Sequence, residues 1–133
     1  MIFTERTVTI KNADAMIDSV IVLYRGDKDV EIIFKIVDSK FRFRNTQGNV
    51  INNTQASYGQ LSISNPYGDI IISDITPCES GAVTFKMTGD MMDELSEVGY
   101  YSFQIRLYND DKTSRVTLPP VIDGIEVKEP ISL

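Results

Sequence analysis

Apolar and polar residues alternate one by one in the stretch from Gly99 to Tyr108, and this pattern is the strongest in the chain. Its apolar positions are Tyr101, Phe103, Ile105 and Leu107. A period of two is typical of a β-strand that buries one face and exposes the other. The polar cluster Asn109–Lys112 interrupts the alternation, which resumes over Thr113–Val116, so the sequence predicts a β-hairpin here.

Shorter segments with the composition of strands are separated by turn residues. Strands are predicted over residues 3–10, 30–37, 58–64, 69–73, 82–88 and 121–128. The first of these is expected at a sheet edge. The apolar run Val20–Tyr24 predicts a strand covered on both faces. Gly26 and Asp27 follow it at once and predict a two-residue hairpin, whereas Asn65–Gly68 predicts a second tight turn. Residues 74–81 are expected to be a connection.

Residues 90–98 form the one segment with helical spacing. Its predicted apolar face consists of Met91, Leu95 and Val98. Thr88 or Asp90 can cap the helix N-terminus, and Gly99 is placed to end it in a left-handed conformation. Two to three turns are marginal alone, so we expect this helix to dock across one end of the β structure.

These elements predict an all-β fold, namely an immunoglobulin-like antiparallel β-sandwich of about eight strands with one short helical crossover. A closed barrel is the alternative. The length of 133 residues predicts a single domain, which we place at residues 1–128, with 129–133 as the start of a linker or tail. The polar stretch 45–55 is expected to be a long surface excursion.

The formal net charge of −6 argues against nonspecific binding to nucleic acid or to anionic membranes, because both rely on a surplus of basic residues. A single cysteine, Cys78, permits no disulfide within the chain. The first residues lack a basic region followed by an apolar block, so no signal peptide is expected.

The residue inventory argues against an enzyme. The chain has no histidine, which excludes histidine-based catalytic triads and histidine metal ligands. Cys78 has no adjacent base to activate it. The acidic clusters at residues 90–97 and 110–111 lack the spacing of a calcium loop and are interpreted as solvated surface. We therefore expect no catalytic residue, metal or cofactor.

Four cations lie within ten residues of this acidic chain: Lys35, Lys40, Arg42 and Arg44. One interpretation is a docking patch for an acidic surface on a neighbouring subunit. The alternative, which we favour, is an edge strand kept soluble by charge. Five tyrosines could in principle include a platform for sugars, but they are scattered and the chain has no tryptophan: Tyr58, Tyr67, Tyr100, Tyr101 and Tyr108. Packing is expected for most of them.

Six segments with strand or turn character follow one another between residues 15 and 128: Tyr24–Lys28, Val30–Asp38, Pro66–Gly68, Ser80–Phe85, Val98–Tyr108 and Thr113–Val116. This ordered series resembles the N-terminal domain of the upper baseplate proteins of tailed phages and prophages of Gram-positive bacteria. No single segment is specific, and the order of all six carries the resemblance.

The resemblance implies a β-sandwich that acts as a structural adapter in the virion tail baseplate. It implies binding to the distal tail protein of the hub, an association with the receptor-binding protein through a C-terminal part, and assembly as a trimer. The sequence ends at Leu133, so that C-terminal part is expected either to lie outside this chain or to be lacking in a short form. Two other classes remain open: a carbohydrate-binding module for host cell-wall polysaccharide, and an unrelated adhesion domain.

Overall fold

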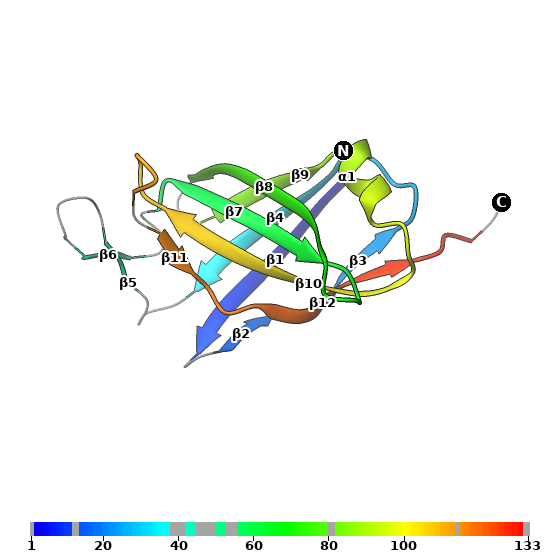
Figure 1. Ribbon diagram of the computed structural model, residues 1–133, viewed down its shortest axis with the longest axis horizontal. Coiled ribbons are helices and arrows are strands. Elements are labelled where there is room, and N and C mark those ends of the chain that lie inside the picture. Colours follow the sequence, from blue (N-terminus) through cyan, green and yellow to red (C-terminus); the bar gives the residue numbers. More distant parts are fainter. Residues whose placement is uncertain are drawn as a thin grey trace.

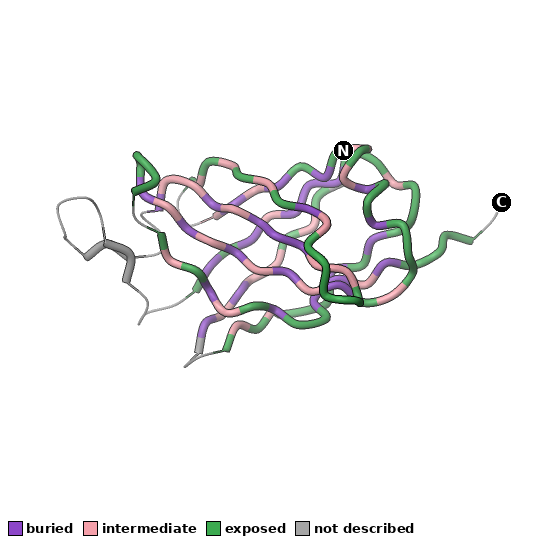
Figure 2. The backbone as a smooth tube through the Cα atoms, viewed as in Figure 1, coloured by how far each residue is buried: buried purple, intermediate pink, exposed green. Residues whose placement is uncertain are grey.

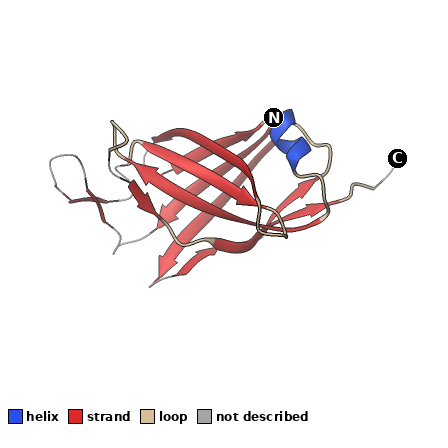
Figure 3. Cartoon of the chain, viewed as in Figure 1, coloured by secondary structure: helices blue, strands red, loops and turns tan. Residues whose placement is uncertain are grey.

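A computed structural model describes residues 2–11, 14–37, 42–44, 50–52, 56–79, 82–113 and 115–131. This part of the chain contains twelve strands and one short helix (Figures 1 and 3). The strands are β1 (Ile2–Lys11), β2 (Asp14–Ile17), β3 (Ile21–Tyr24), β4 (Val30–Val37), β5 (Arg42–Arg44), β6 (Val50–Asn52), β7 (Tyr58–Ser64), β8 (Ile70–Glu79), β9 (Ala82–Met87), β10 (Gly99–Tyr108), β11 (Arg115–Thr117) and β12 (Val121–Lys128), and the helix is α1 (Gly89–Glu94).

Ten of these strands form one curled, open sheet. Their order is β2-β1-β4-β9-β8-β7-β10-β12-β3, with β11 paired to β10, whereas β5 and β6 form a separate two-stranded ribbon. β7, β8 and β10 cross steeply over β1 and β4 (Figure 1). β8 belongs to both halves of the sheet, because most of it pairs with β7 while Cys78 and Glu79 pair with β9. The all-β prediction is confirmed.

The core lies inside the curl, and buried residues alternate with more exposed ones along the long strands (Figure 2). Phe34 of β4 packs against Phe85 of β9 and Phe103 of β10, with ring centroids 6.0 and 5.0 Å apart. All three rings are buried. Since β4 and β9 belong to one half of the sheet and β10 to the other, this trio joins the two halves.

The two edges of the sheet are tied together by the short link between β2 and β3. Arg6 of β1 donates from Nε to the Ser19 carbonyl oxygen at 2.8 Å and from a terminal nitrogen to the Val20 carbonyl oxygen at 3.0 Å. Asp18 also accepts a hydrogen bond from the Thr7 backbone N–H. These contacts hold the link against β1, so the open seam of the sheet is spanned by the chain itself.

The immunoglobulin-like sandwich is not confirmed, because its two halves are joined by continuous hydrogen bonding through β8. The chain also has more strands than the expected eight, and two pairs are parallel: β1 with β4, and β3 with β12. β1 is not an edge strand, since β2 and β4 flank it. The prediction of a wholly antiparallel sheet is wrong for these two pairs. Strands that are distant in sequence meet in each of them, and local alternation does not determine their relative direction.

The turn at Gly26 and the extent of two strands differ from expectation. Gly26 does adopt a positive φ of 87° and the Asp27 N–H donates to the Tyr24 carbonyl oxygen, but β3 and β4 do not pair, so no hairpin forms. β3 exposes Val22 and Tyr24 on one face, so it is not covered on both sides. Residues 74–79, expected to be a connection, continue β8.

The hairpins β7–β8 and β10–β11 are confirmed. The helix is confirmed but is shorter than expected, ending at Glu94. Thr88 is its N-cap, and its hydroxyl accepts a hydrogen bond from the Met91 N–H at 3.3 Å. Met92 is its buried residue and Leu95 is a buried C-cap, whereas Val98 is exposed in the following loop, because the helix ends before a second full turn aligns the expected face.

Candidate functional site

The part of the chain that the structure describes does not test the proposed docking patch of four cations. Lys35 is exposed on β4, and its Nζ lies 2.5 Å from Glu5 Oε1. Lys40 lies outside the described residues, and Arg42 and Arg44 are described only as backbone of β5. Glu5 offsets the charge of Lys35, so this lysine is less suited to an acidic partner, and the patch stays a prediction.

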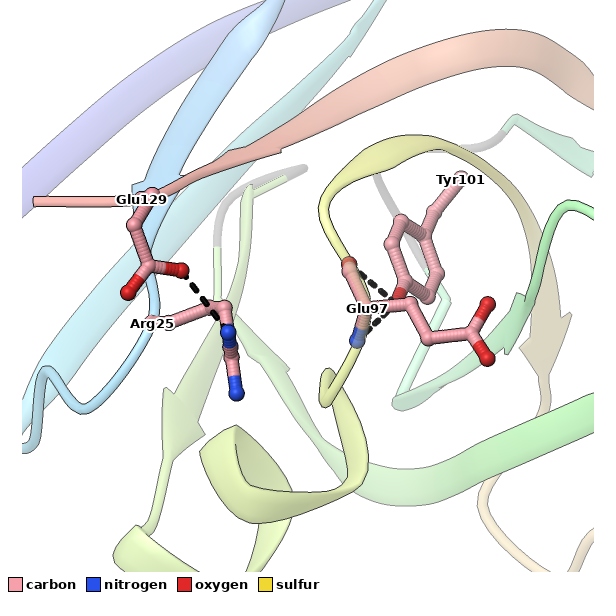
Figure 4. Close-up of polar contacts among 4 residues, drawn as sticks. All are labelled: Arg25, Glu97, Tyr101 and Glu129. Carbon is pink, nitrogen blue, oxygen red and sulfur yellow. Dashed lines mark hydrogen bonds and ion pairs between the residues drawn. The ribbon is translucent and has the colours of Figure 1, made fainter.

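Tyr101 is a structural residue of the core. It is 1% exposed, its hydroxyl donates to the Glu97 carbonyl oxygen at 2.7 Å, and it accepts from the Glu97 N–H at 3.2 Å (Figure 4). Burial raises the pKa of this phenol. Nearby, Arg25 forms an exposed ion pair with Glu129 at 2.7 Å. Tyr101 thus holds the loop after α1 through these two hydrogen bonds, and its buried ring is not available to a ligand.

The other tyrosines do not form a common platform. The Tyr108 hydroxyl donates to Gln60 Oε1 at 2.7 Å, and the ring of Tyr58 has a lysine ammonium 4.6 Å from its centroid. Tyr67 and Tyr100 are exposed. Of these two, only Tyr100 lines a groove.

The acidic turn after β10 is held by hydrogen bonds, and the side chain of the single cysteine packs against the core. Ser57 donates a hydrogen bond to Asp110, and the Thr113 hydroxyl and N–H donate to Asp111, which lowers the pKa of Asp111. Within the described residues no three acidic or cysteine side chains are grouped so as to hold a metal ion. Cys78 is half-buried, and desolvation raises its pKa to about 11.

A groove of about 420 Å³ lies on the outer face of β7, β10 and β12. Its floor is made by outward-facing polar side chains of β7 and β10. These floor residues are Ser62, Ser64, Ser102, Gln104 and Arg106. Ser102 pairs with Ser64 and Gln104 with Ser62 across the two antiparallel strands, so their side chains stand beside one another.

Hydrogen bonds fix the floor. The Gln104 side-chain nitrogen donates to the Leu118 carbonyl oxygen at 2.9 Å, and an Arg106 terminal nitrogen lies 3.4 Å from the Ser62 hydroxyl oxygen, its acceptor. The orientation of these groups is therefore set before any ligand arrives.

One wall of the groove is a bulge in β12. Tyr101 pairs with Ile125 and Phe103 with Val121, so residues 122–124 of β12 oppose a single residue of β10. The extra residues arch away from the ladder, as bulges beside binding sites often do.

The bulge has its own fixed geometry. Asp123 has a positive φ of 54°, and its N–H donates to the Ser102 hydroxyl oxygen at 3.0 Å. A Cβ on Gly124 would lie 2.6 Å from a ring carbon of Phe103, so only glycine fits there without a shift. The result is that Ile122 projects outward and is 68% exposed.

The opposite wall is the turn between β7 and β8. The Asn65 side-chain oxygen accepts from the N–H groups of Tyr67 and Asp69, both at 3.0 Å. Gly68 takes a positive φ of 90°, as the predicted turn requires. Ile70 leaves this turn 69% exposed and lines the groove.

The fold of this chain is shared with solved structures of other proteins. The fold is similar to a solved structure described as the N-terminal domain of phage TP901-1 ORF48. The TM-score is 0.59 at 12% identity, over 96% of this chain and 99% of that one. At this identity the likeness shows a shared fold alone. No protein-family model matches the sequence, and no curated protein sequence matches it. No helix among the described residues has the length and apolar character needed to cross a membrane.

Sequence reasoning missed the groove. Alternation does place Ser102, Gln104 and Arg106 on the outer face of their strand, as the structure has them. The sequence contains no signal that β7 and the β12 bulge flank that face, because they lie some 40 residues before and 20 after it. An Asp123–Gly124 pair inside an apolar strand was the available hint of a bulge.

Proposed function

We propose that this chain is a structural component of a phage tail that holds other tail proteins by protein–protein contact. In the finer form of the proposal it is an adapter domain of the tail baseplate. It binds the distal tail protein of the hub, is linked to the receptor-binding protein through a C-terminal part, and is assembled as a trimer. It acts without turnover.

The observation that carries this proposal is the shared fold with a phage protein domain over nearly the whole of both chains. Two further features support it. The ordered motifs over residues 15–128 resemble the N-terminal domain of the upper baseplate proteins of tailed phages. The chain contains no histidine, and its cysteine has a raised pKa, so the chain lacks the histidine-activated and thiolate nucleophiles of many enzymes.

The test is to look for the chain in virions and to reconstitute its contact. Tail particles of the encoding phage should contain the chain by mass spectrometry in a fixed ratio to the distal tail protein. The purified chain should also co-elute with purified distal tail protein in size-exclusion chromatography with light scattering. Virions that lack the chain, together with no co-elution, would show that the proposal is wrong.

A carbohydrate-binding module is the second candidate, and one observation favours it. The exposed ring of Tyr100 lines a groove whose floor carries hydroxyl and amide groups, which is a suitable surface for a sugar. Titration with host cell-wall polysaccharide distinguishes the two functions, because an adapter should give no saturable binding.

A further inference from the structure

We propose that the outer face centred on Ile122 is the surface by which this chain docks a partner protein. That partner inserts an apolar side chain flanked by lysine or arginine residues. This inference rests on the proposed function and names the contact surface for it.

The first argument is the apolar exposure on this face. Ile122 and Ile70 are 68% and 69% exposed and line the same groove, together with the half-exposed Tyr100. Grouped apolar side chains around a concavity are costly to leave in water and mark interaction sites more than isolated ones do.

The second argument is continuity across the β12 bulge. A second hollow of about 390 Å³ lies between β2 and β12, lined by the exposed side chains of Met16 and Val20. Pro120, Ile122 and Asp123 line both hollows. Ile122 therefore stands on a ridge between the two hollows, which is the central position expected of a binding hot spot.

The third argument is preorganisation. The bulge is held by the hydrogen bond from the Asp123 N–H to Ser102 and by the tight fit of Gly124 against Phe103. The opposite turn is held by the Asn65 side chain. A partner would meet a surface that is already shaped, so little ordering is needed on binding.

The charged side chains around Ile122 indicate the charge of the partner. Asp123 lines both hollows, Asp14 lines the second one, and Asp69 lies in the exposed turn at the groove end. Arg106, the cation that lines the groove, contacts Ser62. Three carboxylates against one guanidinium make this face acidic, as is the whole chain with its net charge of −6, so the face attracts a basic partner. A second copy of the same face would bring carboxylates against carboxylates, so we commit to a different protein.

A hollow of about 560 Å³ lies along β8 and β9, but the charges on this opposite half of the sheet make it less suited to a basic partner. On its outer face the exposed lysines are matched with carboxylates: Lys35 with Glu5 at 2.5 Å, and Lys86 with Glu31 at 3.8 Å. Phe3, on the same half, is 62% exposed and provides a control position of similar exposure to Ile122.

The central experiment compares I122K with F3K. Distal tail protein of the encoding phage is the immobilised probe, and Kd is measured by biolayer interferometry. We expect I122K to weaken binding at least ~30-fold, as loss of a hot spot does. We expect F3K to stay within about twofold of the native chain. Circular dichroism melting verifies that both variants fold, which their exposed positions favour.

A second pair of variants tests the charge argument. D14N combined with D123N should slow association about fivefold at low salt and flatten its salt dependence. Asparagine also tolerates the positive φ at position 123. The control combines D93N with E94Q, which removes the same charge from α1, and should leave association unchanged.

The outcomes separate the inference from the function. If the native chain binds and I122K binds equally well, the docking surface is wrong while the tail role stands. If the native chain binds no tail protein and is absent from virions, the proposed function fails. Saturable binding of a neutral cell-wall oligosaccharide that is lost in Y100A would overturn the inference in favour of a glycan site. Self-association abolished by I122K would overturn it in favour of a second copy.

Discussion

Replacing Gly59 by alanine should destabilise the protein through a single contact. Gly59 lies in β7, and a Cβ built there would be 2.6 and 2.9 Å from the two Cγ atoms of Val83. Val83 lies two strands away on β9, with β8 between them, and is fully buried. The close approach occurs where the sheet curls through β8. Because packed cores resist added methyl groups, we expect a loss of about 1–3 kcal/mol in the free energy of unfolding.

A double-mutant cycle identifies the contact. Val83→Ala removes both clashing methyl groups, which costs about 1.6 kcal/mol by transfer (about 0.8 per group) and about 2–3 kcal/mol with the cavity included. In that background the Cβ of Gly59→Ala enters vacated space, where the nearest Val83 atom is Cβ at 3.3 Å. The double variant should therefore be more stable than the sum of the single losses by about 1–2 kcal/mol.

Urea unfolding followed by circular dichroism gives these free energies, provided that the m-values agree. Gly89→Ala is the matched control, since its Cβ would meet only the Lys28 side chain, at 3.8 Å or more, and alanine favours a helix. It should be neutral or stabilising by up to about 1 kcal/mol. The proposed contact between Gly59 and Val83 would be refuted if Gly59→Ala left the free energy of unfolding unchanged, or if its effect and that of Val83→Ala were additive.

Three further outcomes follow from the contacts described above. Thr88→Ala should lower the free energy of unfolding, followed by thermal melting, by about 1 kcal/mol, because the Met91 N–H loses its hydrogen-bond acceptor. Tyr101→Phe should cost about 1–2 kcal/mol and speed hydrogen exchange of the Glu97 amide, which loses its acceptor. Cys78 should react slowly with thiol reagents at pH 8, and its raised pKa means that the unfolded thiol ionises first. Stability should thus fall as pH rises from about 9 to about 11 in the native chain, and fall less in Cys78→Ala titrated alongside.

The features that could be predicted from the sequence are local ones. Alternation identified β7, β9, β10 and β12, because a strand with one buried face requires an apolar residue at every second position. The cap at Thr88 and the glycine turn at Gly68 were also predictable, since each depends on residues within a few positions.

The features that could not be predicted depend on which strands meet. Nothing near Gly26 says that β3 joins β12 while β4 joins β1, because the partners are distant in sequence. Pro77 suggested a connection, yet it is tolerated in β8 near the point where pairing passes from β7 to β9.

The same limit applies to the candidate site. A cluster of cations is visible in one line of sequence, but the carboxylate that offsets Lys35 comes from β1, thirty residues earlier. The groove is assembled from β7, β10 and β12, and nothing in the sequence near Ile122 of β12 indicates which strands lie beside this exposed residue.

The bulge affects both the stability of the fold and the shape of the groove, and substitutions at two of its positions distinguish these effects. Gly124 faces Phe103, which packs on Phe34 in the centre of the core, so a side chain at 124 would disturb the core and the groove together. Ile122, two residues away, faces solvent, so its substitution changes the surface with little effect on packing. Loss of binding at 122 without loss of stability is therefore informative about the surface, whereas loss of both at 124 is not. For this reason the test of the docking surface depends on Ile122.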